Sequence, residues 1–285
     1  MIYKNILQKI TFIYVILLTL SGFSEGTISP VQSLDRPMDL DIVSPVYQYA
    51  SDERSTDFYN NYLPEVLDIV NQNLAENISL TSETVSSLSV DPSKLTFTQD
   101  YDARVYFVKD GAGYHNSLGF NPDGVGVDEG TPQLVFPDAS YHRKLQYWNE
   151  EQPLRIGDYV ELGTISAGTT LDFFVIPDGA DGGTNRGFTP FTTVTEMNPD
   201  GIQHAISFAI EDSPYIIMGF EDIYNGGDQD YNDLLFVVDI GQNAVQNVID
   251  NSALVPEPEE ILILIIFSMF LIKYLKVNQF SLNLS

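Results

Sequence analysis

The chain has 285 residues, with 13 basic against 40 acidic side chains and a formal net charge of -27. A surface this acidic repels nucleic acid and anionic membrane surfaces, so we expect no nucleic-acid partner. The sequence contains no cysteine, which excludes a disulfide scaffold, a thiol nucleophile and a cysteine-ligated metal site. The length allows one large domain of about 200 residues with additional terminal segments. The negative charge fits both simple solubility and a role that depends on cations.

The N-terminal segment has the features of an export signal. Lys4 and Lys9 precede an apolar run over residues 10–20, and the small residues Gly22 and Ser24 follow it. This order predicts a signal peptide at residues 1–24, cleaved after Ser24, with a retained membrane anchor as the alternative. We therefore expect an exported protein.

Residues 25–94 are expected to form a lead-in segment before the main domain. The first part is polar and interrupted by prolines, which is typical of an irregular segment. The sequence PEVLDIVNQNLAE (residues 64–76) then predicts one amphipathic helix, because its leading proline suits a first helical turn and its apolar residues recur at helical spacing. Residues 57–63 could extend this helix backwards with a kink at the proline. The apolar stripe is formed by Val66, Val70 and Leu74.

From residue 95 onwards the sequence changes to short aromatic and β-branched runs bounded by Gly, Pro, Asn and Asp. Eight or so such runs, with no helical pattern among them, predict a mainly β fold over residues 95–242. We expect an antiparallel β-sandwich with a jelly-roll-like arrangement. The expected strands are 96–98, 104–108, 133–136, 159–165, 171–176, 205–210, 215–220 and 234–240.

Two loops rich in Asp and Gly, residues 121–130 and 177–185, fit either calcium ligation or ordinary turns, and turns are the preferred interpretation. The three histidines are scattered without zinc spacing, and no G-x-S-x-G, P-loop or HExxH motif occurs. Trp148 lies in a polar run, where a loop anchor is preferred over a sugar-stacking platform. We therefore expect no enzymatic activity.

The stretch GFEDIYNGGDQDYNDLLFVVDI (residues 219–240) holds the candidate metal site, because it concentrates five carboxylates at residues 221–233 and contains no lysine or arginine. Acids this close repel each other unless a cation or amide donors compensate them. The alternate spacing from residue 228 matches the first EF-hand ligands, but a strand follows where that motif has a helix. We therefore predict a calcium ion in a curled loop between strands. The expected ligands are Asp228, Asp230, Asn232 and Asp233, with Glu221 and Asp222 as further ligands or as acceptors around them.

Three stretches resemble the DUF4114 family, a domain of unknown function found in exported bacterial proteins. FEDIYNGGDQDYNDLLF (residues 220–236) is similar to the closing signature of that family. KDGAGYHNSLGF (residues 109–120) is similar to its opening motif, and GTISAGTTLDFFVIPDG (residues 163–179) to its middle. The resemblance implies a β-rich domain with a calcium loop and no known enzymatic activity.

The C-terminal segment resembles a PEP-CTERM sorting tail, in which a Pro-Glu-Pro motif precedes a short membrane segment and basic residues. The sequence departs from that family because two lysines followed by uncharged residues replace the usual arginine cluster. The resemblance implies recognition by an exosortase-type sorting enzyme and an association with extracellular polysaccharide. The sorting motif is formed by Val255, Pro256, Glu257 and Pro258.

The apolar run after this motif is short for a membrane span. Its twelve residues, 261–272, extend about 18 Å as a helix, against a hydrocarbon core of about 30 Å, so only a thin insertion is expected. We expect a linker at residues 243–258, a transmembrane or sorting helix at residues 259–277 and a tail at residues 278–285.

These features together predict an exported bacterial cell-envelope or extracellular-matrix protein. The expected function is that of a calcium-stabilised β-sandwich module for binding or structure, held at the membrane by the C-terminal segment or released after processing. Two alternatives stay open at this stage: an extracellular hydrolase acting on polysaccharide, and a carbohydrate-binding module.

Overall fold

The computed structural model describes residues 26–29, 33–74, 89–140 and 154–253. The expected signal peptide, the sorting motif, the apolar C-terminal segment and the final tail lie outside the described residues, as does Trp148. Within the described ranges, no helix is both long and apolar enough to cross a membrane.

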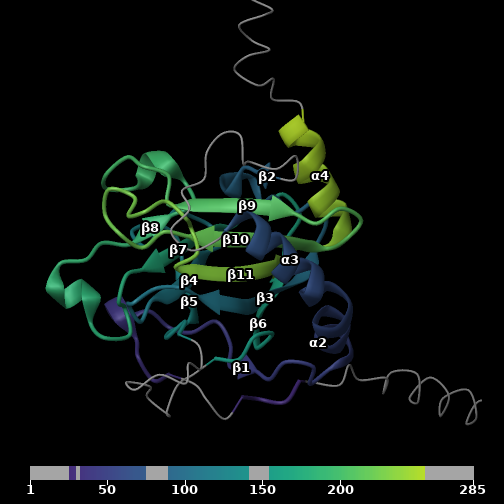
Figure 1. Ribbon diagram of the computed structural model, residues 1–285, viewed down its shortest axis with the longest axis horizontal. Helices are drawn as coiled ribbons and strands as arrows, with labels where there is room; N and C mark the ends of the chain where they lie inside the picture. Colours follow the sequence, from purple (N-terminus) through teal and green to yellow (C-terminus); the bar gives the residue numbers. More distant parts are fainter. Residues whose placement is uncertain (1–25, 30–32, 75–88, 141–153, 254–285) are drawn as a thin grey trace, which may run out of the picture.

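Two antiparallel β-sheets form the centre of the fold, as the sequence predicts (Figure 1). The larger sheet has the order β1 (Val46–Tyr47), β6 (Tyr159–Ile165), β3 (Tyr101–Asp110), β11 (Leu234–Asp239), β10 (Tyr215–Phe220), β9 (Ala205–Ala209) and β2 (Ser89–Val90). The smaller sheet has the order β5 (Gln133–Phe136), β4 (Ser117–Asn121), β7 (Asp172–Ile176) and β8 (Phe191–Thr192).

Most expected strands are confirmed, and the exceptions have simple causes. The run at residues 96–98 makes only an isolated bridge, between Thr96 and Thr170. Strand β4 was missed because glycine and polar residues interrupt its apolar pattern, and β8 because it has only two residues.

The strand order combines successive neighbours with pairings between strands that are distant in sequence. Among the described residues, successive strands lie side by side in four of the nine neighbouring pairs: β4–β5, β7–β8, β9–β10 and β10–β11. The other five pairs join strands that do not follow one another, such as β3 with β11 and β4 with β7. The two antiparallel sheets are confirmed, and the jelly-roll-like arrangement stays a prediction.

Alternation along the central strands builds two separate apolar layers. Phe107 and Phe236 face the smaller sheet, and the ring of Phe236 lies 5.3 Å from that of Phe173 in β7. Their chain neighbours Tyr106 and Val237 face the opposite side, because side chains alternate along a strand. Central strands are thus apolar on both faces, which explains why β7 and β10 show no polar alternation.

The opposite side of the larger sheet is covered by a helical segment formed by α2 (Glu53–Asp57), the π-helical turn η2 (Phe58–Tyr62) and α3 (Leu63–Asn73). The expected helix at residues 64–76 is therefore correct in position, but it begins earlier and ends at Asn73. A reciprocal cap between Asp52 and Ser55 starts the segment. Phe58 then stacks on Tyr106 of the sheet at 4.0 Å between ring centroids.

Residues 243–253, which we expected to belong to a linker, form most of helix α4 (Gln242–Ala253), at the upper right in Figure 1. Ala244, Val245 and Val248 are buried in the core between the two sheets. Their spacing places them on one helical face, and the other positions are mostly polar. The linker interpretation failed because three small apolar residues in a polar run give only a weak helical pattern.

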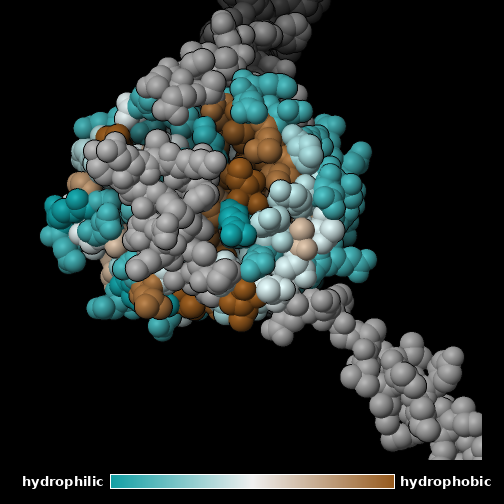
Figure 2. All heavy atoms as spheres, turned by 60° about the horizontal axis from the view of Figure 1, so that its bottom comes forward, coloured by the Kyte–Doolittle hydropathy of each residue, from teal (hydrophilic) through white to brown (hydrophobic). Residues whose placement is uncertain are grey.

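On the face shown in Figure 2, apolar residues gather in a central band and hydrophilic residues cover much of the remaining described surface. Six large apolar side chains are exposed among the described residues, and two of them, Ile223 and Tyr224, belong to the loop between β10 and β11. That loop also carries the predicted metal ligands.

Candidate metal centre

The structure brings all six predicted ligands into the connection between β10 and β11. Phe220, the last residue of β10, pairs with Leu234, the first of β11, so residues 221–233 form a hairpin loop. We call its carboxylates and amide the acidic centre: Glu221, Asp222, Asp228, Asp230, Asn232 and Asp233.

Left-handed backbone conformations curl this loop, as a metal site of this sequence would require. The φ angle is positive at Asn225, Gln229 and Tyr231 as well as at Gly226 and Gly227. Such residues reverse the chain direction locally, and three of them are not glycine, which is uncommon. The polar side chains therefore converge and are not spread along an extended strand.

Two glycines make room for the converging side chains. A Cβ atom at Gly227 would lie 1.8 Å from Glu221 Oε1, and a Cβ at Gly111 would lie 2.1 Å from Asn232 Oδ1. Neither position accepts a side chain without displacing a member of the acidic centre. Gly111 also donates its N–H to the carbonyl of Asn232 at 3.1 Å, which joins the end of β3 to the loop.

The carboxylates approach closely enough to share a cation. One oxygen from each of Glu221, Asp228 and Asp230 lies within 4.8 Å of the others, and the same holds for Glu221, Asp222 and Asp233. Calcium binds its oxygen ligands at about 2.3–2.6 Å, so two ligands of one ion are separated by at most about 5 Å. Both sets fit this limit.

Two residues of the acidic centre each have one buried side-chain atom without a hydrogen-bond partner. Glu221 is 1% exposed and its Oε2 receives no donor, and Asn232 is 2% exposed and its Nδ2 finds no acceptor. A buried polar group without a partner costs about 1–3 kcal/mol, and more when it is charged. The protein part of the centre is therefore electrostatically incomplete.

Burial and mutual repulsion disfavour the charged forms of these acids. Burial and the charge of Asp233 raise the pKa of both Glu221 and Asp222. Burial also raises the pKa of Asp233 itself. A bound divalent cation would reverse this effect, because a nearby positive charge stabilises the ionised carboxylate.

Residues distant in sequence hold the acidic centre in place. Asn116, at the start of β4, donates from Nδ2 to Asp222 Oδ2 at 2.6 Å and accepts the backbone N–H of Asp178 at 3.0 Å. The backbone N–H of Asp222 donates to Asp233 Oδ2 at 2.9 Å. Sequence reasoning did not assign a role to Asn116, although it lies within the stretch at residues 109–120 that suggested the family resemblance.

His204 fixes the other side of the loop. Its Nδ1 lies 2.9 Å from the carbonyl oxygen of Glu221, and its Nε2 lies 2.9 Å from Asp200 Oδ2. The same Asp200 oxygen accepts the N–H of Asn225 at 2.8 Å. The imidazole is fully buried and stacks on Phe191 at 3.6 Å between ring centroids, so His204 positions the loop and is not a metal ligand.

The two other Asp/Gly-rich loops have the hydrogen bonds of ordinary turns, which was the preferred interpretation. Asp123 accepts both the N–H and the hydroxyl of Thr131, and Asp172 accepts the N–H of Gly126. Asp178 is ion-paired with Arg186. In the part of the chain that the structure describes, neither loop contributes to a close set of acids.

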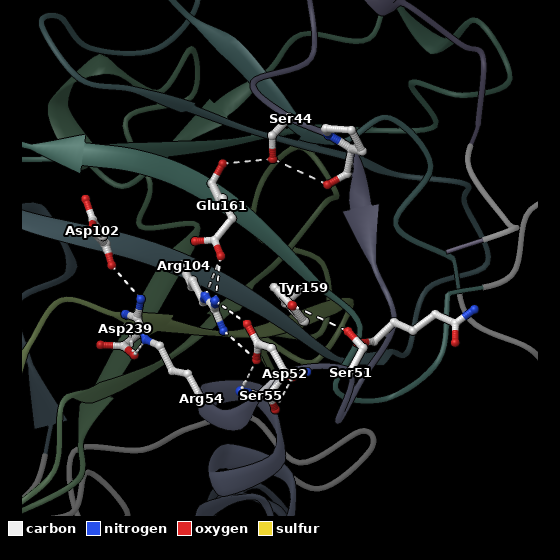
Figure 3. Close-up of polar contacts among 12 residues, drawn as sticks. Ser44, Ser51, Asp52, Arg54, Ser55, Asp102, Arg104, Tyr159, Glu161 and Asp239 are labelled. Carbon is white, nitrogen blue, oxygen red and sulfur yellow. Dashed lines mark hydrogen bonds and ion pairs between the residues drawn. The ribbon is translucent and has the colours of Figure 1, made fainter. Parts of the chain in front are cut away.

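A second buried group of charges shows how this chain compensates acids elsewhere (Figure 3). Arg104 donates to Asp52 Oδ2 at 2.5 Å and to Glu161 Oε1 at 2.7 Å, and Arg54 donates to Asp239 Oδ2 at 2.8 Å. Each of these three carboxylates therefore faces a guanidinium.

The acidic centre differs, because no ion pair among the described residues includes Glu221, Asp222 or Asp233. A hollow of about 470 Å³ lies beside the arginine group, and none of its lining residues belongs to the acidic centre. The candidate site is therefore distinct from this hollow and is a ligand-rich loop.

Residues 165–241 match the model of a family described as a domain of unknown function, DUF4114. The matched segment starts at the end of β6 and contains the whole acidic centre. The stretch at residues 109–120, which also suggested this resemblance, lies outside it. Comparison with curated proteins and with solved structures gives no match.

Proposed function

We propose that this chain is a calcium-stabilised β-sandwich module that serves binding or structure in the bacterial cell envelope or extracellular matrix. The acidic centre is the observation that carries the proposal. It combines convergent carboxylates, a buried Glu221 oxygen without a donor and no ion pair from the described basic residues to Glu221, Asp222 or Asp233.

Calcium fits this donor set better than other common ions. The side chains offer only oxygen ligands, which suit calcium and magnesium, whereas zinc favours cysteine and histidine. Magnesium demands near-ideal octahedral geometry at 2.0–2.1 Å and keeps several waters, whereas calcium accepts six to eight oxygens in a flexible arrangement. A curled loop with several carboxylates matches the second description. Asp228, Asp230, Asn232 and Asp233 would supply the calcium ligands together with Glu221 and Asp222.

The spacing of the acids favours binding over glycoside hydrolysis. Retaining glycosidases place two carboxyl groups about 5–5.5 Å apart, and inverting enzymes about 6.5–9.5 Å apart, on opposite sides of the sugar. The acids here form two sets of three in one hairpin loop, and one oxygen of each acid lies within 4.8 Å of the others in its set. We therefore propose a non-enzymatic role.

The terminal segments support an envelope location in this proposal. The basic and apolar N-terminal segment favours export. The VPEP motif and the apolar run after it favour sorting by an exosortase-type enzyme, and the C-terminal segment would lie in the membrane before processing. Extracellular polysaccharide is the expected neighbour of such a protein.

A carbohydrate-binding module is the second candidate function, and one observation favours it. Tyr224 and Ile223 are 53% and 48% exposed in the same loop as the acidic centre. An exposed aromatic ring beside a cation can stack on a sugar while the ion binds hydroxyl groups. Tyr224→Ala should then weaken calcium-dependent retention on acidic polysaccharide resins, and Met197→Ala, an equally exposed apolar side chain elsewhere, should not.

Calorimetric titration of the full chain with calcium chloride, in a mild non-ionic detergent, tests the main proposal. We expect binding with a dissociation constant of about 10⁻⁴–10⁻³ M, as for other extracellular sites. Asp230→Asn should weaken it at least tenfold, whereas Asp181→Asn, an exposed acid in another Gly-rich loop, should not change it. Absence of binding by the wild-type chain at 10 mM calcium would disprove the proposal.

A further inference from the structure

The carboxylates of the acidic centre divide into two sets that have only one residue in common. The outer set is Glu221, Asp228 and Asp230, and the inner set is Glu221, Asp222 and Asp233. Within each set the oxygens lie within 4.8 Å of one another, but the five acids do not form a single set. One ion with ligands at about 2.3–2.6 Å therefore reaches one set fully and not both.

We propose that the acidic centre binds two calcium ions, bridged by the carboxylate of Glu221. The proposal rests on the calcium-binding function proposed above and extends it to the number and the arrangement of the ions. A carboxylate has two oxygens with about four lone-pair directions, so it can contact two cations at once. Glu221 suits this role, because residue 227 is a glycine whose missing Cβ would lie 1.8 Å from Oε1, and because Oε2 has no protein donor.

Charge balance also favours two ions. Glu221, Asp222 and Asp233 of the inner set carry three negative charges when ionised and have no ion pair among the described residues, so a single divalent cation would not neutralise even this set. Asn232 supplies a further observation, because its buried Nδ2 finds no hydrogen-bond acceptor. A half-turn of that amide about its last torsion presents Oδ1, a neutral calcium ligand, in the same place.

The two sets differ in exposure, and this difference predicts an order of binding. Asp228 of the outer set is exposed, whereas Asp222 of the inner set is 3% exposed and held by the side chain of Asn116. Preorganised ligands lose less conformational freedom when an ion binds. The inner ion should therefore bind more tightly, and the outer ion should exchange with solvent.

The number of bound ions can be measured by native mass spectrometry and calorimetric titration of the full chain, released from a mild detergent, with calcium chloride. The wild-type chain should bind two ions. Asp228→Asn and Asp222→Asn should each bind one, and Glu221→Gln should bind none at the concentration that saturates the wild type. Asp181→Asn should still bind two.

The outcomes separate this proposal from the one on which it rests. A single ion in the wild-type chain, lost in both Asp variants, would overturn the two-ion arrangement and leave the calcium function intact. No bound ion would overturn both. If circular dichroism shows that Asp222→Asn does not fold, the test rests on Asp228→Asn, because the side chain of Asp228 is exposed and its replacement should not disturb folding. An Asp228→Asn variant that still binds two ions, or that binds none, contradicts the proposal.

Discussion

Replacing Glu221 with glutamine should change stability in opposite directions with and without calcium. In chelator at pH 8 the unfolded chain carries an ionised Glu221, while the folded chain either buries that charge or takes up a proton, because burial raises the pKa of Glu221. Both cost free energy. Glutamine has nearly the same shape and no charge, so Glu221→Gln should stabilise the calcium-free protein. In calcium the same substitution removes a ligand and should destabilise it.

The size of the effect follows from the burial of the side chain. Glu221 is 1% exposed and its Oε2 has no donor. A buried polar group without a partner costs about 1–3 kcal/mol, and more when it is charged. Glutamine removes the charge and can donate from its amide to the neighbouring Asp233 carboxylate, so we expect the free energy of unfolding in chelator to rise by about this amount. In calcium at ten times the dissociation constant, the wild-type protein gains about 1.4 kcal/mol per site, and the variant should lose this gain.

Urea unfolding of the full chain in detergent, followed by circular dichroism in chelator and in calcium, measures both changes. Asp181→Asn serves as the control and should shift neither midpoint by more than a few tenths of a kcal/mol, because its side chain is exposed. A Glu221→Gln variant that is destabilised equally in both buffers would refute the reasoning, since Glu221 would then be a structural hydrogen-bond acceptor and not a cation ligand.

Further predictions concern the pH dependence of the acidic centre, the arginine group and helix α4. The calcium-free protein should lose stability as the pH rises above about 4. Burial raises the pKa of Glu221 and Asp222 in the acidic centre, so above this pH the folded state binds more protons than the unfolded state. The urea midpoint in chelator should therefore fall between about pH 5 and pH 8. Arg104→Met should lower the free energy of unfolding by about 3–5 kcal/mol by chemical denaturation, because Asp52 stays buried without its partner. Hydrogen bonds from Arg104 and Ser55 outweigh burial and lower the pKa of Asp52 to about 2, so acid should remove the contribution of this carboxylate only as the pH falls from about 4 towards 2. Val248→Ala should lower the free energy of unfolding by about 1.5–2.5 kcal/mol in the same assay, because Val248 is buried in the core. The control Gln246→Ala should lower it by less than about 0.5 kcal/mol, because Gln246 is exposed. Equal effects would show that α4 does not contribute to the core.

The parts of the fold that were predictable from sequence are those that local pattern determines. Runs such as residues 215–220 and 234–240 are continuous, aromatic or β-branched and bounded by turn residues, and they form central strands. Helix α4 could not be found in this way, because Val245 and Val248 are recognisable as core residues only once the strands against which they pack are known.

The candidate site could likewise be predicted from sequence only in part. The acids from Glu221 to Asp233 were found because they are neighbours in sequence. Asn116 and His204 contact that loop from positions just before β4 and β9, and a single sequence gives no signal that joins them to it. The separation of the acids into two sets was equally hidden, since it depends on left-handed residues such as Gln229 whose conformation the sequence does not reveal.

Thermal unfolding of the wild-type full chain in calcium, in magnesium and in chelator tests the central claim most directly. At calcium concentrations ten times the dissociation constant, linkage predicts about 1.4 kcal/mol of stabilisation per site, which is a rise in melting temperature of about 3–6 °C for a domain of this size. Magnesium at the same concentration should give a smaller rise, because the loop does not impose octahedral geometry. Identical melting in all three buffers would contradict the account and leave the acidic centre as a curled turn without a cation.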